Sequence, residues 1–236
     1  QYDIKAIFFT DDTFTINKER IRILCNLLIE EGLSKKIKWD VQGRTNLITW
    51  DDLELLKLMK RAGCVQIDYG FETGSQRILD MLKKKGVTIE DNKRAMQITK
   101  KAGLHVMGTF MLGNPSETES DLEQTKDFIL GNLNNIDYFQ ALISTPYPGT
   151  ELYDICLKGG IIKGSYLEQV DEENLKSDKP VVYSDSIGRD KVIETLKYLN
   201  KIAAKKISIT DKMKWLAINL FKNPSRIVNA IKLHYS

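Results

Sequence analysis

Polar and charged residues follow each of the apolar, strand-like stretches in this 236-residue sequence. They include the carboxylates of Asp11 and Asp12, the guanidinium of Arg44 and the carboxylate of Glu72. Carboxylates accept hydrogen bonds from ammonium and hydroxyl groups, and a guanidinium forms two parallel hydrogen bonds with a carboxylate. Brought together, these groups would suit a ligand that carries an amine, a carboxylate and hydroxyls.

Five β-rich stretches must position these residues. They cover residues 4–9, 37–42, 65–71, 104–112 and 138–144. Between them, apolar residues recur at helical spacing, for example after the candidate N-cap Asn17. Gly32, Gly63 and Gly103 each follow such a helical stretch and are expected to end it in the left-handed conformation. The alternation predicts an α/β fold with a parallel sheet, in which ligands bind at the carboxyl ends of the strands.

Each polar residue at a strand end also has a purely structural interpretation. Asp12 or Thr13 could cap the following helix, Ser116 and Glu117 with Asp121 could form a capping arrangement, and TPYPGT could be only a rigid turn. Capping does not require a guanidinium or a second acid at neighbouring strand ends. The clustering at five consecutive strand ends therefore favours a ligand site.

Composition excludes several classes of protein. With 42% hydrophobic and 28% charged residues, the chain has the composition of a folded domain, and no apolar run approaches the roughly 20 residues of a membrane span. Cys25, Cys64 and Cys156 are too far apart for a zinc or thiol-redox motif, so we expect them to pack as small apolar side chains in a reducing compartment. The two histidines are also far apart and predict no metal site. We expect a cytoplasmic protein and, because the chain begins at Gln1, a fragment of a longer one.

The pattern changes after residue 160. Residues 1–160 form the predicted β/α domain, 161–188 a polar linker or loop, and 189–236 a basic helical extension. The extension holds eleven Lys or Arg and three Asp or Glu, a net charge of +8. Its apolar positions around Trp215 and Ile227 predict two helices separated by Pro224. We expect these helices to pack on the domain, with peripheral contact to an anionic membrane as the alternative and no binding to nucleic acid.

The strand-end segments together resemble a known family. These segments are DDTFTINKERIRILCNLLIEEGL, WDVQGRTNLI, LLKLMKRAGCVQIDYGFETGSQRILDMLKKKGVT, AGLHVMGTFMLGNPSETESDLEQT and STPYPGTELYD. In order and spacing they are similar to the catalytic barrel of radical S-adenosylmethionine (SAM) enzymes, most of all to the branch that carries an N-terminal cobalamin-binding domain. The resemblance covers about residues 4–158.

The resemblance implies a partial (β/α)6 TIM-type barrel, with strands 2 to 6 present, followed by a C-terminal helical extension. The family binds SAM and a [4Fe-4S] cluster, some members also bind cobalamin, and SAM is cleaved reductively to a 5′-deoxyadenosyl radical. Asp11, Asp12 and Thr13 match the loop that meets the methionyl amine, and Arg44 is a plausible partner of the methionyl carboxylate. Gly70 and Glu72 match the motif that binds the ribose or methionyl part. The further cofactor-binding residues that the resemblance implies are Ser75, Gly108, Phe110, Met111, Gly113, Thr145 and Tyr147.

Two departures from the family pattern stand out. The family holds its cluster with three cysteines in C-x3-C-x2-C, and no such spacing occurs here. We therefore expect the first strand and the cluster ligands to lie upstream of this chain, no metal ligands within it, and no activity from the chain alone. Ser116 stands where the family usually has glycine, which is tolerable if that turn needs no positive φ.

The leading hypothesis is the C-terminal part of a radical SAM enzyme that performs methyl transfer, ring formation or another radical step. Its expected partners are a small-molecule or lipid-like substrate, the missing N-terminal segment of the same protein, and a reductant protein such as flavodoxin or ferredoxin. One alternative is a cluster-free protein that kept the SAM pocket or only an interaction surface. Another is an unrelated β/α-barrel hydrolase or aldolase that uses Asp11, Asp12 and Glu72 as acid and base groups.

Overall fold

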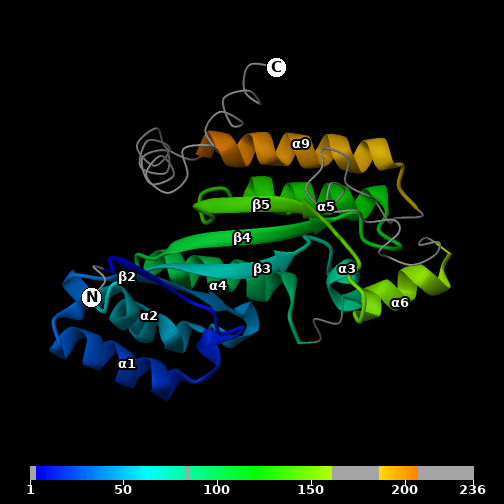
Figure 1. Ribbon diagram of the computed structural model, residues 1–236. Helices are drawn as coiled ribbons and strands as arrows, with labels where there is room; N and C mark the ends of the chain where they lie inside the picture. Colours follow the sequence, from blue (N-terminus) through cyan, green and yellow to red (C-terminus); the bar gives the residue numbers. More distant parts are fainter. Residues whose placement is uncertain (1–3, 83–85, 161–185, 207–236) are drawn as a thin grey trace, which may run out of the picture.

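The computed structural model describes residues 4–82, 86–160 and 186–206. Its centre is a parallel sheet of five strands in the order β1-β2-β3-β4-β5 (Figure 1). The strands are β1 (Ala6–Phe9), β2 (Lys38–Gly43), β3 (Cys64–Glu72), β4 (His105–Leu112) and β5 (Tyr138–Ile143). Each strand pairs with the next one along the chain, as in the wall of a β/α barrel. The predicted α/β class and the five predicted strands are confirmed, each boundary to within two residues.

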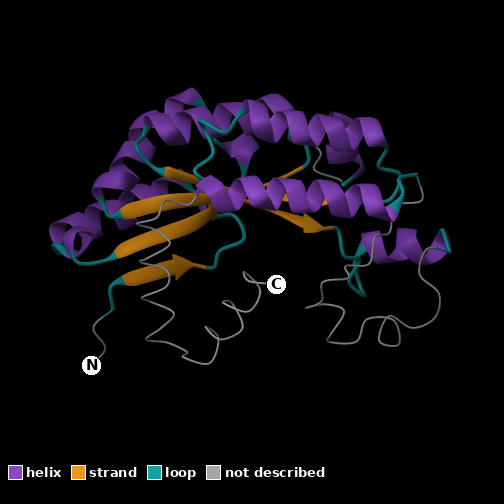
Figure 2. Ribbon diagram, turned by 90° about the horizontal axis from the view of Figure 1, so that it is seen from above, coloured by secondary structure: helices purple, strands orange, loops and turns teal. Residues whose placement is uncertain are grey.

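The connections between strands are helical. The α-helices are α1 (Lys18–Glu30), α2 (Leu53–Arg61), α3 (Gln76–Met81), α4 (Ile89–Lys101), α5 (Glu119–Gly131), α6 (Glu151–Lys158) and α9 (Arg189–Lys206). Short 3-10 helices are η1 (Phe14–Ile16), η2 (Leu33–Lys35), η3 (Thr45–Leu47) and η4 (Trp50–Asp52). Figure 2 shows most of the helices gathered on one side of the twisted sheet. The described core therefore lies between this side of the sheet and its helices.

Burial alternates along the strands because only one face of the sheet is packed against helices. In β3, Ile67, Tyr69 and Phe71 are at most 1% exposed, whereas Gln66 and Asp68 on the opposite face are partly exposed. Parallel strands that are covered on both faces usually read as continuous apolar runs. The alternation leaves a face that the described helices do not cover, polar in β2 and β3, and this face contributes to the site described below.

Helix ends follow the predicted chemistry. Asn17 caps α1, because its side chain accepts a hydrogen bond of 2.9 Å from the backbone N–H of Arg20. Gly32, Gly63 and Gly103 have φ values of 65°, 101° and 80°, the left-handed conformation expected where a helix stops before the next strand. These sharp stops direct each new strand back into the sheet.

Helix α9 covers the edge of β5 (Figure 1). The side chain of Asn200 accepts a hydrogen bond of 3.0 Å from the backbone N–H of Ala141 and donates one of 2.9 Å to the Ala141 carbonyl. An amide side chain thus satisfies the backbone groups that a further strand would pair with, which protects the edge from unwanted pairing.

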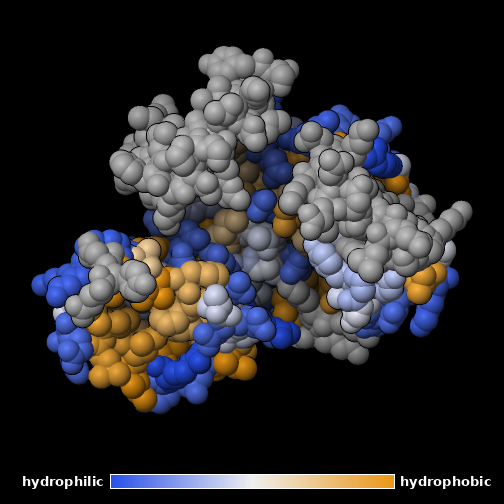
Figure 3. Space-filling model, viewed as in Figure 1, coloured by the Kyte–Doolittle hydropathy of each residue, from blue (hydrophilic) through white to orange (hydrophobic). Residues whose placement is uncertain are grey.

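The opposite edge of the sheet is β1, which pairs only with β2 among the described residues. Nearby apolar side chains are exposed, including Phe8 of β1 and Ile23 and Leu27 of α1. Figure 3 shows a large apolar surface over the part of the molecule where α1 lies in Figure 1. This side of the described structure therefore combines an unpaired strand edge with an apolar helix face.

The three cysteines, Cys25, Cys64 and Cys156, are all buried and free, as predicted. Among the described residues, no helix has both the length and the apolar character needed to cross a membrane. Apart from residues 186–188, the predicted linker lies outside the described residues. So do the two predicted helices around Trp215 and Ile227.

Candidate functional site

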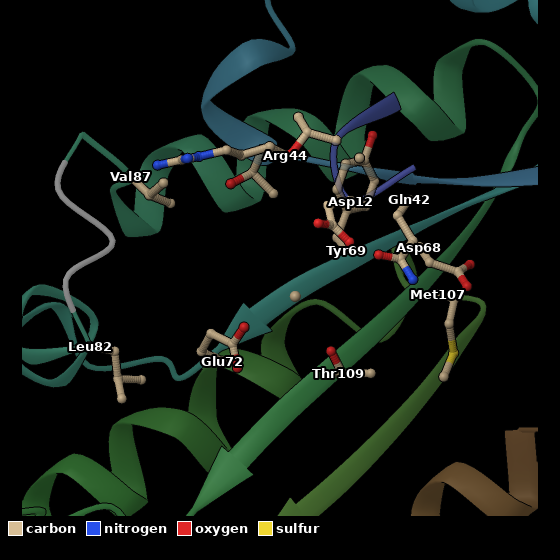
Figure 4. A pocket seen from close by; sticks show the side chains of 14 residues that line it. Asp12, Gln42, Arg44, Asp68, Tyr69, Glu72, Leu82, Val87, Met107 and Thr109 are labelled. Carbon is tan, nitrogen blue, oxygen red and sulfur yellow. The ribbon is translucent and has the colours of Figure 1, made fainter. Parts of the chain in front are cut away.

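A cavity of about 620 Å³ opens where the carboxyl ends of β2 and β3 meet the loop after β1 (Figure 4). The residues that line it are Asp12, Thr13, Gln42, Gly43, Arg44, Thr45, Asp68, Tyr69, Gly70, Glu72, Leu82, Val87, Met107 and Thr109. Five of the residues predicted from the sequence, Asp12, Thr13, Arg44, Gly70 and Glu72, are among them. Their roles in binding remain predictions, but the fold brings them to one cavity.

The loop after β1 separates its two acids. Asp12 and Thr13 line the cavity, whereas Asp11 pairs with Arg20, with 2.9 Å between Oδ1 and Nη1. The Arg20 guanidinium also lies over the ring of Phe14, 5.1 Å from its centroid. Asp11 therefore does not contribute to the cavity wall. Capping of α1 by Asp12 or Thr13 does not occur, because Asn17 takes that position.

Arg44 follows the end of β2 and is held by its neighbours on the chain. Its backbone N–H donates to Thr15 Oγ1 at 3.3 Å, and the adjacent Thr45 hydroxyl donates to the buried Asn92 at 2.8 Å. Figure 4 shows the guanidinium extended across the cavity toward Val87. It forms no ion pair with a described residue, so its charge is available to an anionic group of a ligand.

Glu72 ends β3 in a strained conformation. Its φ of 65° is left-handed, which costs a non-glycine residue about 1–2 kcal/mol, and a bulge between Gly70 and Glu72 shifts the register against β4. Strain of this kind is often concentrated at functional sites, where it aims a side chain. Here it accompanies a carboxylate that lines the cavity.

Ser75, by contrast, belongs to the support of the site. It is 1% exposed, caps α3, and donates a hydrogen bond of 2.6 Å to Asp121 Oδ1. Thr73 shares a hydrogen bond of 2.9 Å with Thr125, and a Cβ on Gly74 would lie 2.5 Å from the backbone oxygen of Gln124. The loop after β3 thus packs tightly on α5, which fixes the position of Glu72.

The turn after β4 is built around the buried Glu117. Its Oε2 accepts hydrogen bonds from the backbone N–H of Gly113 at 2.6 Å and of Asn114 at 3.0 Å. Burial raises the pKa of Glu117 to about 7, although the two N–H donors act against this rise. Gly113 therefore serves this turn and does not line the cavity.

The predicted capping arrangement at this turn is corrected. The N-cap of α5 is Thr118, which forms a capping box with Asp121, whereas Ser116 and Glu117 lie before it. Burial acts to raise the pKa of Asp121, but hydrogen bonds from Arg77, Ser75 and Thr118 outweigh it and hold that pKa well below its usual range. Ser116 has a φ of 60°, so the turn does adopt the positive φ that glycine prefers.

The other predicted positions lie away from the cavity. Phe110 is completely buried, and a Cβ on Gly108 would lie 2.7 Å from the ring of Phe71, so both face the helix side of the sheet. Met111 is half-buried on the opposite face, beyond the lining residues. Thr145 donates to the carbonyl of Ile143 at 3.2 Å, and Tyr147 is 52% exposed.

Several lining residues were not predicted from the sequence. They are Gln42, Gly43, Thr45, Asp68, Tyr69, Leu82, Val87, Met107 and Thr109. Four of them, Gln42, Asp68, Met107 and Thr109, lie on the strand face that points away from the helices. The alternation of polar and apolar residues in β2, β3 and β4 is the signal that identifies them.

Sequential β/α units with a polar cavity at the carboxyl ends of the strands define a β/α-barrel type of fold with a candidate ligand site. The model of the radical SAM superfamily matches residues 1–129, so the chain belongs to the radical SAM superfamily. A relative from Pyrococcus horikoshii, named uncharacterized methyltransferase PH0819, is 38% identical over 69% of this chain and 34% of that protein. The anaerobic magnesium-protoporphyrin IX monomethyl ester cyclase of Rubrivivax gelatinosus is 28% identical over 82% of this chain and 33% of that protein.

Solved structures share the fold. The radical SAM methyltransferase TsrM from Kitasatospora setae, with cobalamin and a [4Fe-4S] cluster bound, has a TM-score of 0.57 at 17% identity over 68% of this chain and 30% of that one. The coproporphyrinogen III oxidase HemN from Escherichia coli has a TM-score of 0.56 at 12% identity, over 86% of this chain and 41% of that one. The chain spans about a third of the length of the first curated relatives that it matches.

Proposed function

We propose that the cavity is the SAM-binding site of a radical SAM enzyme that transfers a methyl group or closes a ring. The observation that carries the proposal is the convergence of Asp12, Arg44 and Glu72, from three consecutive strand ends, on one cavity. Family membership supports SAM as the ligand. The choice between methyl transfer and ring closure rests on the relatives, which include a named methyltransferase and a cyclase.

The side chains fit the polar groups of SAM. Arg44 would hold the methionyl carboxylate through two parallel hydrogen bonds. Asp12 and Thr13 would accept hydrogen bonds from the methionyl ammonium, and Glu72 would accept hydrogen bonds from the ribose hydroxyls. When SAM is bound and receives an electron, it supplies a 5′-deoxyadenosyl radical for the reaction.

The described residues do not fit a [4Fe-4S] cluster. No group of three or more His, Cys, Asp or Glu among them could hold a metal ion. Burial raises the pKa of Cys25 to about 11 and that of Cys64 still further, so neither presents a thiolate. We propose that the cluster is held by a separate segment of the complete protein, which pairs with the open edge of β1 and packs on the apolar face of α1. Without this segment the chain is expected to be inactive.

Three further proposals concern the cofactor, the electron donor and the C-terminal extension of the complete protein. Cobalamin is proposed because TsrM, which shares the fold, binds it and is a methyltransferase. A cytoplasmic flavodoxin or ferredoxin is proposed as the electron donor. The basic extension at 189–236 is proposed to pack on the domain, and α9, the part of it that is described, already covers β5.

The SAM site is tested by calorimetry with the complete, anaerobically reconstituted protein. Removal of a bidentate charged contact costs about 1.5–3 kcal/mol, so Arg44→Gln should weaken SAM binding by about tenfold or more. Arg22→Gln is the matched control, because Arg22 is exposed on α1 away from the cavity. Equal SAM affinity in the wild type and Arg44→Gln would refute the site. Normal binding without formation of 5′-deoxyadenosine would instead support the cluster-free alternative.

A further inference from the structure

The sheet face that points away from the described helices is largely polar in the middle of β2, β3 and β4, whereas Phe8 of β1 and the pair Met111–Leu142 near the ends of β4 and β5 are apolar. Strand pairing aligns its residues in rows. The rows are Asp40–Gln66–His105, Gln42–Asp68–Met107 and Gly70–Thr109–Gln140. The interior of a TIM-type barrel is usually filled by layers of Val, Ile and Leu. None of these nine positions carries such a residue, so this face offers hydrogen-bonding groups where an apolar core would be expected.

Part of this face forms one end of the cavity. Gln42, Asp68, Met107 and Thr109 line the same 620 Å³ as the residues assigned to SAM. Figure 4 shows Gln42, Asp68 and Met107 grouped together, while Arg44 extends toward the opposite side of the cavity. The cavity therefore has a cationic side at Arg44 and an acidic side at Asp68, and Asp12 and Glu72 add two further carboxylates to its lining.

The acidic side offers an unused hydrogen-bond acceptor. Gln66 Nε2 donates to Asp68 Oδ1 at 2.7 Å. The other oxygen of Asp68, Oδ2, has no hydrogen-bond partner among the described residues. Asp40 Oδ1 in the same face also has none, but Asp40 does not line the cavity. Burial raises the pKa of Asp40, with a further contribution from Asp68, and burial raises the pKa of Asp68. A donor group bound in the cavity would give Asp68 Oδ2 the hydrogen-bond partner that it lacks.

We propose that this acidic side is the substrate subsite, and that the substrate presents to Asp68 a cationic hydrogen-bond donor such as an ammonium or amidinium group. This inference rests on the proposed function, because it takes the other side of the cavity as the SAM site. An anionic substrate end would be repelled by the Asp68 carboxylate, and an apolar one would leave Asp68 Oδ2 without a partner. Met107 supplies the apolar surface beside the charged group.

The test uses benzamidine as a probe and benzoate as its anionic counterpart, titrated into the complete protein in the presence of saturating SAM. Benzamidine should bind the wild type more tightly than benzoate does, and Asp68→Asn should weaken benzamidine binding at least tenfold. Glu119→Gln removes the same charge from an exposed position on α5 and should change nothing. Gln42→Glu adds an acid beside Asp68 on an exposed position and should tighten benzamidine binding severalfold.

Several outcomes would overturn the substrate assignment. They are the absence of benzamidine binding, equal binding of benzoate, and unchanged benzamidine binding in Asp68→Asn. If Asp68→Asn weakens SAM binding as much as Arg44→Gln does, Asp68 belongs to the SAM site and the proposal fails. If Asp68→Asn does not fold, unchanged or weaker benzamidine binding in Gln42→Glu decides against it. Loss of SAM binding by the wild type, with Asp68-dependent benzamidine binding retained, would refute the proposed function alone.

Discussion

The buried carboxyl of Glu117 should make the stability of the fold depend on pH. Glu117 is completely buried, and its pKa rises from the ordinary value of 4.5 to about 7. This difference corresponds to about 3 kcal/mol between the protonated and ionised forms. Because the pKa of Glu117 is raised in the folded state, the protonated carboxyl favours the folded state. This contribution to the free energy of unfolding is complete below about pH 4.5 and is lost as the pH rises through 7.

The variant Glu117→Gln isolates this contribution. Glutamine keeps an oxygen that can accept from the N–H groups of Gly113 and Asn114, but it cannot ionise. From pH 4.5 to pH 8 the wild type should lose about 3 kcal/mol more of its free energy of unfolding than Glu117→Gln loses. Urea unfolding followed by circular dichroism at several pH values measures this difference.

The exposed Glu119 supplies the control, because Glu119→Gln removes the same charge two residues away. The free energy of unfolding of Glu119→Gln should depend on pH in the same way as that of the wild type. If the free energy of unfolding of Glu117→Gln has the same pH dependence as that of the wild type, the Glu117 carboxyl does not have a raised pKa in the folded protein.

Three further substitutions test the packing that positions the site, each by urea unfolding. Gly74→Ala should destabilise the fold by about 1–3 kcal/mol, because the added Cβ would clash with the backbone of α5. Gly131→Ala is the control and should be neutral or slightly stabilising, because a Cβ there meets nothing within 4 Å. Equal effects of the two substitutions would contradict the close approach of Gly74 to α5. Asn200→Ala should lower the free energy of unfolding by about 1–3 kcal/mol, because it removes both hydrogen bonds to Ala141. Lys201→Ala is the control at an exposed position and should leave the free energy of unfolding unchanged. An unchanged free energy of unfolding in Asn200→Ala would mean that α9 does not hold the edge of β5. Ser116→Gly should be more stable than Ser116→Ala by about 1 kcal/mol because φ is 60°, and the reverse order would exclude a left-handed turn in solution.

The strands and helix ends could be predicted because their signals are local. Apolar β-rich runs located the five strands, and a glycine after each of three helices marked a left-handed stop, as at Gly63. The capping of α5 was misplaced by two residues, although Thr118 and Asp121 have the spacing of a capping box. Serine and glutamate, as at the nearby Ser116 and Glu117, are also common at helix starts, so residue type alone does not show which residue caps α5.

The site could be predicted only in part, because position at a strand end does not tell which face a side chain takes. Phe110 and Gly108 alternate with Thr109, so they point to the helix side when Thr109 lines the cavity. Ser75 lies at the right strand end but is taken up by Asp121 of α5, 46 residues away along the chain. A search confined to the residues after each strand misses Asp68, which lies within β3, whereas the alternation of β3 indicates one polar face.

The proposed SAM site lies in the cavity between the loop after β1 and the ends of β2 and β3. The most direct measurement is backbone hydrogen–deuterium exchange of the complete protein with and without SAM. SAM binding should slow exchange in residues 11–15, 43–47 and 70–74, with little change in the turn at 113–118. Protection confined to other segments, or no change in these three, would contradict it.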